Sequence, residues 1–213
     1  MPDLSPMLVA PDPGPASDWV KRWTHLLAPR TTVLDIACGN GRHMKWFTKH
    51  GHVVTGVDRS ALAIAPAGRF GETVLADIEN DPWPLIENAQ VRQFGCVIVT
   101  NYLWRPLFPT IAQSLAQGGV LIYETFTQGN ETMGKPSNPD FLLRPAELLE
   151  VFSPFHVVAF EEGFLDDPAR FVQRITAVRP DAGLAGTPPY ALEPRHSVFS
   201  KSGMSLSEGD LLG

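Results

Sequence analysis

Three successive apolar segments carry an aspartate at or near their ends, and these acids are the first candidates for binding chemistry. Asp35 lies inside VLDIACGNGRH (33–43), Asp58 ends HVVTGVD, and Asp77 ends ETVLAD. A strand, a glycine turn and a helix in succession usually hold a nucleotide-like ligand. A carboxylate at the end of the second segment suits a bidentate hydrogen bond to a ribose diol, and a solvated turn acid is the alternative for Asp58.

The glycine loop between the first strand and its helix distinguishes two kinds of adenosine ligand. Gly39 and Gly41 are present, but Met44 stands where a dinucleotide fingerprint needs its third glycine, and Ala37 takes the first small position. A pyrophosphate would be repelled by Asp35, whereas an ammonium group would be attracted. The pattern therefore favours S-adenosylmethionine over a nicotinamide dinucleotide. A structural carboxylate that bonds the amides of its own turn is the alternative for Asp35.

Alternating β-rich and helical segments predict an α/β fold with a mainly parallel sheet and helices on both faces. The last two strand candidates flank the turn Asp166-Asp167-Pro168 and predict an antiparallel hairpin at the sheet edge. The expected strands are 32–37, 52–58, 72–77, 94–101, 118–126, 155–164 and 169–179. The expected helices are 18–28, the segment after Gly41, 60–69, 107–117 and 145–152.

The chain of 213 residues fits one domain. The proline-rich residues 1–15 are expected to form an extended arm, because proline removes backbone donors. Residues 16–179 are expected to form the single domain, and the Gly-, Pro- and Ser-rich residues 180–213 a tail.

Composition narrows the class of protein. A hydrophobic content of 44% and a charged content of 19% are those of an ordinary globular domain. The net charge of −6 argues against a general nucleic-acid binder, although an RNA held by a few arginines remains open. Cys38 and Cys96 match no disulfide or zinc spacing, so we expect a cytoplasmic protein without a metal site. No apolar run suggests a membrane span, and the acidic N-terminus is unlike a signal peptide.

From about residue 33 to 179, the chain resembles the Rossmann-like, class I S-adenosylmethionine-dependent methyltransferases. ACGNGRH, GHVVTGVDRS and LADIENDPWPL stand at the family's expected places, and the first two look most like the tellurite-resistance and thiopurine-type branch. The resemblance implies a seven-stranded sheet whose last strand is antiparallel. It also implies three parts of a cofactor site. Asp58 would hold the ribose, and Asp77 with Ile78 would flank the adenine. The loop on the methionine side would be formed by Asp35, Ala37, Gly39 and Gly41.

The fourth and fifth strand ends should meet the methyl acceptor. Asn101 is expected beside the cofactor, and Tyr102, Arg105 and Glu124 are the candidate catalytic residues. The segment lacks the Asn/Asp-Pro-Pro-aromatic run of many nucleic-acid amine methylases. A core-packed helix start is the alternative for Tyr102 and Arg105, while the loop 127–144 is long enough to be a lid.

A small-molecule acceptor is the function favoured by the acidic charge. Methylation of RNA or protein, and a non-catalytic S-adenosylmethionine-binding module, remain alternatives. A nicotinamide oxidoreductase is disfavoured by Met44 and Asp35, and the oligomeric state stays open.

Overall fold

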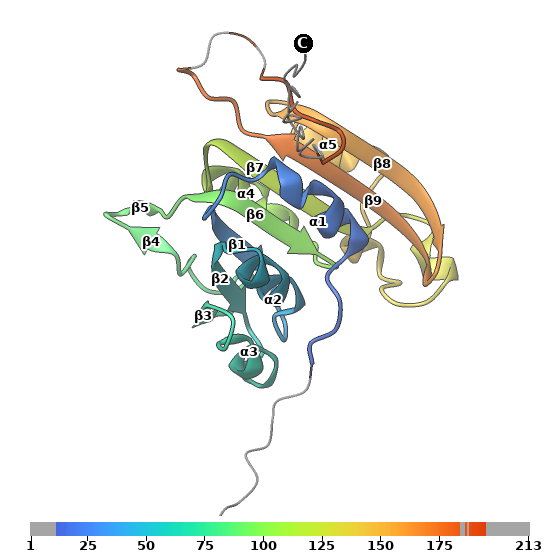
Figure 1. The fold of residues 1–213 in the computed structure, drawn as a ribbon. Helices are drawn as coiled ribbons and strands as arrows, with labels where there is room; N and C mark the ends of the chain where they lie inside the picture. The colour runs from blue at the N-terminus through green and yellow to red at the C-terminus, as the bar shows by residue number, and fades with distance from the viewer. Residues whose placement is uncertain (1–11, 184–185, 187, 195–213) are drawn as a thin grey trace, which may run out of the picture.

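A seven-stranded sheet forms the centre of the structure, a computed structural model that describes residues 12–183, 186 and 188–194. Its strand order is β3-β2-β1-β6-β7-β9-β8, and β9 runs antiparallel to the other six strands (Figure 1). The strands are β1 Thr32–Ile36, β2 Val53–Asp58, β3 Glu72–Leu75, β6 Phe94–Thr100, β7 Leu115–Phe126, β8 His156–Asp166 and β9 Ala169–Val178. The α/β architecture and the C-terminal antiparallel hairpin predicted from the sequence are confirmed.

Helices cover both faces of the sheet, because each face carries its own apolar cluster. Side chains of α1, α2 and α3, among them Trp19, Phe47 and Ile64, pack in one cluster. Phe108 of α4 and Leu148 of α5 belong to the other, and these two helices lie behind the sheet in Figure 1. The helix bounds are α1 Asp18–Trp23, α2 Arg42–Lys49, α3 Ala61–Ala67, α4 Phe108–Gln113 and α5 Glu147–Val151.

Several elements differ from the expected boundaries. The helix expected over 107–117 ends at Gln113, since the chain already joins the sheet at Leu115, which pairs with Phe94 before a register shift. A small hairpin of β4 Ile86–Glu87 and β5 Gln90–Val91 is additional. The predicted lid loop contains two 3-10 turns, η3 Asn130–Thr132 and η4 Pro139–Phe141. Two further 3-10 turns, η1 Thr24–Leu26 and η2 Arg105–Leu107, adjoin α1 and α4.

The two ends of the described chain lie against the domain. Asp12 forms an ion pair with Lys45 at 2.6 Å, and Tyr190 packs on the ring of His156 at 5.1 Å between centroids. Much of the expected arm and tail lies outside the described residues. We therefore keep the division into arm, domain and tail as a proposal.

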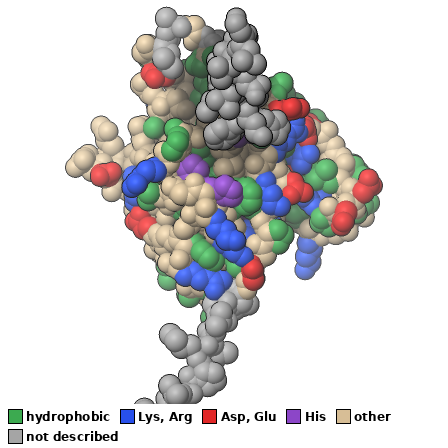
Figure 2. All heavy atoms as spheres, viewed as in Figure 1, with side chains coloured by type: hydrophobic (Ala, Val, Ile, Leu, Met, Phe, Trp, Pro, Cys, Tyr) green, Lys and Arg blue, Asp and Glu red, His purple; other side chains and the backbone are tan. Residues whose placement is uncertain are grey.

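Charged side chains of both signs are interspersed on the face of the molecule seen in Figure 2. The net charge of −6 therefore does not appear there as one continuous acidic field. This leaves room for local sites with a charge opposite to that of the whole chain.

Candidate functional site

The carboxyl ends of the parallel strands surround a cavity of about 300 Å³, here called the first cavity. Ligands of open α/β sheets bind at this edge of the sheet, where the strand order reverses. Here the reversal lies between β1 and β6. The residues lining the first cavity are Ala37, Asp58, Arg59, Asp77, Ile78, Glu79, Asn101, Tyr102, Leu103, Thr125, Phe126, Pro136 and Phe141.

Two non-glycine residues of the first cavity have a left-handed backbone. Ala37 follows β1 with φ +54°, and Asn101 follows β6 with φ +54°. Such conformations cost of order 1–3 kcal/mol and cluster at functional sites. The residue that follows each of these two strands therefore turns the backbone sharply at the wall of the first cavity.

Asp58, at the end of β2, anchors the glycine loop. Its two oxygens accept hydrogen bonds from the backbone N–H groups of Gly39 and Ser60, each at 2.8 Å. The side chain is half-buried and lines the first cavity. Each carboxylate oxygen has a second lone pair, so Asp58 can still accept a diol from the cavity side.

Asp77 and Ile78 form the far wall of the first cavity. Asp77 accepts from the N–H of Glu79 at 3.1 Å and from the Asn80 amide at 2.9 Å. These hydrogen bonds, with that from Asn80 the strongest, hold the pKa of Asp77 below its usual range. Ile78 is buried beside it and offers an apolar surface. A polar acceptor next to an apolar face suits an aromatic base that carries an amine.

Asp35 is buried in β1, at 1% exposure, and does not line the first cavity. Its Oδ1 lies 3.9 Å from Nδ1 of His43, while its Oδ2 has no hydrogen-bond partner among the described residues. Burial, and to a lesser extent the charge of Asp58, raises the pKa of Asp35 from 3.8 to about 7, against the opposing effects of Arg42 and the Met44 N–H. A cationic group would find an unsatisfied oxygen here.

Asp35→Asn is expected to stabilise the fold without ligand by about 1–3 kcal/mol at pH 8, since the amide keeps the shape without a buried charge. Because the folded pKa of Asp35 is raised to about 7, the folded wild type binds more protons than the unfolded chain between pH ~4 and 7. The free energy of unfolding of the wild type should therefore fall as the pH rises from about 4 to 7, because folded Asp35 must give up its proton. Urea unfolding of both proteins across this range checks it. Exposed Asp81→Asn is the control, and a wild type more stable than Asp35→Asn at pH 8 would contradict the account.

The glycine loop lies close to its neighbours at two positions. A Cβ on Gly41, which has φ +82°, would meet the Ala67 side chain at 2.9 Å. A Cβ on Gly56 of β2 would lie 2.5 Å from the Met44 sulfur and 2.7 Å from that of Cys38. The space that a dinucleotide fingerprint makes with its third glycine is thus provided here by Gly56 on the adjacent strand, which allows Met44 to pack.

A second cavity, of about 480 Å³, adjoins the first, and both are lined by Asn101 and Phe126. Its walls come from the N-terminal arm, α1, α2, the end of β7, the lid loop and the β8–β9 turn. The residues lining the second cavity are Pro15, Ala16, Ser17, Asp18, Lys21, Arg42, Asn101, Glu124, Phe126, Asn130, Met133, Gly134, Lys135, Asp167, Pro168, Ala169 and Arg170.

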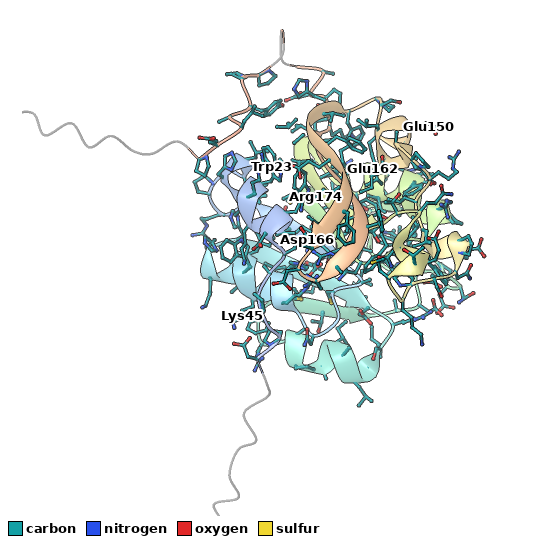
Figure 3. All side chains as sticks on the ribbon, turned by 90° about the vertical axis from the view of Figure 1, so that its right-hand side faces the viewer. Trp23, Lys45, Glu150, Glu162, Asp166 and Arg174 are labelled. Atoms are coloured by element: carbon teal, nitrogen blue, oxygen red, sulfur yellow. The ribbon has the colours of Figure 1, made fainter. Side chains whose placement is uncertain are left out.

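Glu124 presents a carboxylate to the second cavity and is 3% exposed. It accepts a hydrogen bond from Ser17 Oγ at 3.0 Å and from the Arg174 guanidinium at 3.3 Å. Arg174 also lies 4.8 Å from the centre of the Trp19 ring. In Figure 3, Arg174 is labelled on β9, and Asp166 marks the end of β8 beside the turn. The N-cap residue of α1 and the strand β9 thus hold Glu124 from two sides.

Arg105 lines neither cavity. Its guanidinium forms an ion pair with Glu147 at 2.7 Å and donates to the carbonyls of Asp140 and Leu142, at 2.7 and 2.8 Å. Burial works against the charge on Glu147, but hydrogen bonds from Arg105 and the Arg144 N–H outweigh it and lower the pKa of Glu147. Arg105 therefore fastens the segment 139–147 to the domain, which the sequence-based interpretation of Arg105 as a catalytic residue did not anticipate.

The remaining predicted site residues are divided between the two cavities. Of the cofactor candidates, five line the first cavity, whereas Asp35, Gly39 and Gly41 do not line it. Of the catalytic candidates, Tyr102 lines the first cavity and Glu124 the second. The five are Ala37, Asp58, Asp77, Ile78 and Asn101. Sequence reasoning missed Ser17 and Arg174 as partners of Glu124, because no local pattern pairs residues so far apart.

Metal-ligand clusters and membrane-spanning helices are both absent from residues 12–183, 186 and 188–194. No group of three or more His, Cys, Asp or Glu side chains there could hold a metal ion. None of the helices described has both the length and the apolar character that crossing a membrane requires.

Residues 33–119 match the family model described as a methyltransferase domain. Among solved structures, TehB from Haemophilus influenzae is 19% identical with a TM-score of 0.57, covering 72% of this chain and 59% of that chain. A SAM-dependent methyltransferase from Methanosarcina mazei is 14% identical with a TM-score of 0.60, over 78% and 99% of the two chains. The N-methyltransferase NodS from Bradyrhizobium japonicum is 15% identical with a TM-score of 0.55, over 72% and 88%. No curated protein matches the chain.

The sheet order and the cavity at the strand ends define a class I, Rossmann-like methyltransferase fold. Residues 33–119 therefore match a methyltransferase domain, and solved structures with this fold include methyltransferases that depend on S-adenosylmethionine as cofactor. The site residues fit this cofactor, since acids border the first cavity and the buried Asp35 oxygen lacks a partner among the described residues. The chain spans 59% of the length of TehB.

Proposed function

We propose that the protein transfers the methyl group of S-adenosylmethionine to a small molecule that enters through the second cavity. The observation that carries this proposal is the junction of the two cavities at Asn101 and Phe126. The second cavity, at about 480 Å³, has the size of a small-molecule site. The names of TehB and NodS do not identify the acceptor of this chain.

In this proposal, the cofactor lies along the predicted residues of the first cavity. Asp58 holds the ribose diol, and Asp77 with Ile78 holds the adenine. Asp35 attracts the ammonium group from beneath the glycine loop, and Asn101 lies at the edge shared with the second cavity. The contacts of Asp58 and Asp77 described above leave their cavity-facing lone pairs free for these roles.

When bound, S-adenosylmethionine would supply an activated methyl carbon. The acceptor's lone pair would form the new bond to this carbon, the electron pair of the carbon–sulfur bond would return to sulfur, and any acceptor proton would pass to water. The chain must therefore chiefly align the acceptor and exclude competing water. Phe126 provides an apolar wall at the junction, and Glu124 accepts a hydrogen bond from an acceptor N–H or O–H.

Tyr102, and His43 at the start of α2, are the other side chains near the site that could take a proton from an acceptor, and neither is suited to act as a base. Burial, with a smaller effect of Glu79, raises the pKa of Tyr102, so its phenol stays protonated and does not act as a base. Burial, followed by the charge of Arg42, lowers the pKa of His43 to about 3. His43 Nε2 accepts from the Ser17 N–H at 3.3 Å, and the residue lines neither cavity. Glu124 is thus the acidic group we assign to acceptor orientation.

The proposal is tested by supplying S-adenosylmethionine with a panel of small thiols, amines, hydroxyl compounds and acids, and separately with RNA and protein. We expect S-adenosylhomocysteine to form with at least one small molecule, and Glu124→Gln to reduce kcat/KM for that acceptor by about 10- to 100-fold, the scale of one charge-assisted contact. Exposed Glu87→Gln is the matched control. Transfer to RNA or protein alone would contradict the proposed acceptor class, and no transfer to any arm would favour the non-catalytic module.

A further inference from the structure

The second cavity has an unusual balance of charge for an acidic chain. Two of its acids already have cationic partners, since Glu124 pairs with Arg174 at 3.3 Å and Asp18 with Lys21 at 2.9 Å. Asp167 is the remaining acid of the wall. The paired groups contribute little net charge to the space between the walls.

Three cations of the same wall have no carboxylate partner within ion-pair distance in the part of the chain that the structure describes. Arg42 donates to the Thr100 hydroxyl at 3.4 Å, and Arg170 donates to the Pro168 carbonyl at 3.4 Å. Lys135 makes no hydrogen bond or ion pair with any described residue. These cations outnumber the remaining acid, so the second cavity is positive although the chain as a whole carries −6.

The three cations come from separate elements that meet only at this cavity. Arg42 begins α2, Lys135 belongs to the lid loop, and Arg170 lies on β9 next to the hairpin turn. The charge of Arg42 also stabilises the carboxylate of the buried Asp35, so Arg42 is not available to an acceptor alone. Lys135 and Arg170 remain for a ligand at the outer end of the second cavity.

We propose, on the basis of the proposed function, that the methyl acceptor carries a carboxylate or phosphate group that Lys135 and Arg170 bind in the second cavity. A neutral acceptor would leave these cations uncompensated, and a cationic acceptor would be repelled by them. The planar guanidinium of Arg170 can bind either anion with two parallel hydrogen bonds, while Lys135 supplies a point charge. The other end of the acceptor then lies toward Asn101 and Phe126, where the first cavity begins.

The test uses the full chain saturated with S-adenosylhomocysteine and two matched pairs of probes. Benzoate is compared with benzamide, and phenyl phosphate with phenol, by calorimetry at low and high salt; inorganic phosphate shows the binding of the anion alone. We expect an anionic probe to bind about tenfold or more tightly than its neutral partner, the lower end for hydrogen bonds to charged groups. This preference should weaken in high salt, and the anion with the larger preference identifies the class.

Three variants separate the proposed site from a general effect of charge. Lys135→Gln and Arg170→Gln each remove one charge from the second cavity, and each should reduce the preference by about tenfold. Arg30→Gln removes one charge from an exposed position outside the cavity and should leave the preference unchanged. Unchanged melting temperatures establish that the variants fold.

Three results would overturn the inference: equal affinities within both pairs, a preference that survives in both cavity variants, or no detectable binding of either anionic probe. Failure of S-adenosylhomocysteine to bind in the first step would instead contradict the proposed function. The two failures are therefore distinguishable.

Discussion

Arg105→Ala is expected to lower the free energy of unfolding by about 3 kcal/mol, the lower end of the cost of breaking a buried ion pair. Glu147 is 2% exposed and would keep only the N–H of Arg144 at 2.8 Å and its guanidinium at 3.5 Å. The carbonyls of Asp140 and Leu142 would lose their donor as well. For a chain of this size, the melting temperature should fall by about 6–12 °C.

Two further variants control for this effect. Arg144→Ala removes a guanidinium whose side chain is 61% exposed, and should cost about 1 kcal/mol or less. The double variant Arg105→Met, Glu147→Leu leaves no buried charge unpaired and should be more stable than Arg105→Ala. An unchanged melting temperature together with a lower kcat/KM would show instead that Arg105 acts on the acceptor.

The succession of strands and helices along the chain could be predicted because each signal is local. Apolar runs of strand length alternate with helical segments, and the turn around Pro168 marks the antiparallel hairpin. Register and element ends depend on partners elsewhere in the chain. The pairing of Leu115 with Phe94, for example, begins β7 earlier than the glycine pair Gly118-Gly119 suggests.

The residues predicted for the cofactor were easier to place from the sequence than those predicted for the acceptor, because their signals are also local. Strand ends such as Asp58 and Asn101 follow apolar runs directly, and the structure brings them to one cavity. Glu124 lies 107 residues from Ser17, and Arg105 lies 42 residues from Glu147. Contacts over such separations depend on the folded topology. The sequence alone therefore could not show whether Arg105 faces the cleft or binds the lid segment.

Asp58→Ala is expected to weaken the binding of S-adenosylhomocysteine by about 1.5–3 kcal/mol, or roughly 10- to 150-fold, because a hydrogen bond to a charged group is lost. Asp58 also holds the N–H groups of Gly39 and Ser60, so part of the loss could come from a loosened loop. Asp58→Asn keeps one acceptor oxygen and should lose less affinity. Calorimetric titration of the three proteins measures the effect.

A ligand lacking the ribose 2′-hydroxyl separates the contact from the loop effect. Wild type should bind 2′-deoxy-S-adenosylhomocysteine more weakly than the parent compound, whereas Asp58→Ala should bind the two about equally. Equal discrimination by both proteins would place the ribose away from Asp58.

The cavity at the strand ends is expected to bind both the adenosine and the amino-acid parts of one cofactor. Titration of the wild-type protein with S-adenosylhomocysteine, and in parallel with NADH, tests it most directly. We expect one-to-one binding of S-adenosylhomocysteine and a stabilisation of about 2.7 kcal/mol at a hundredfold excess over Kd, with no binding of NADH. Binding of NADH in place of S-adenosylhomocysteine, or no stabilisation by either ligand, would contradict it.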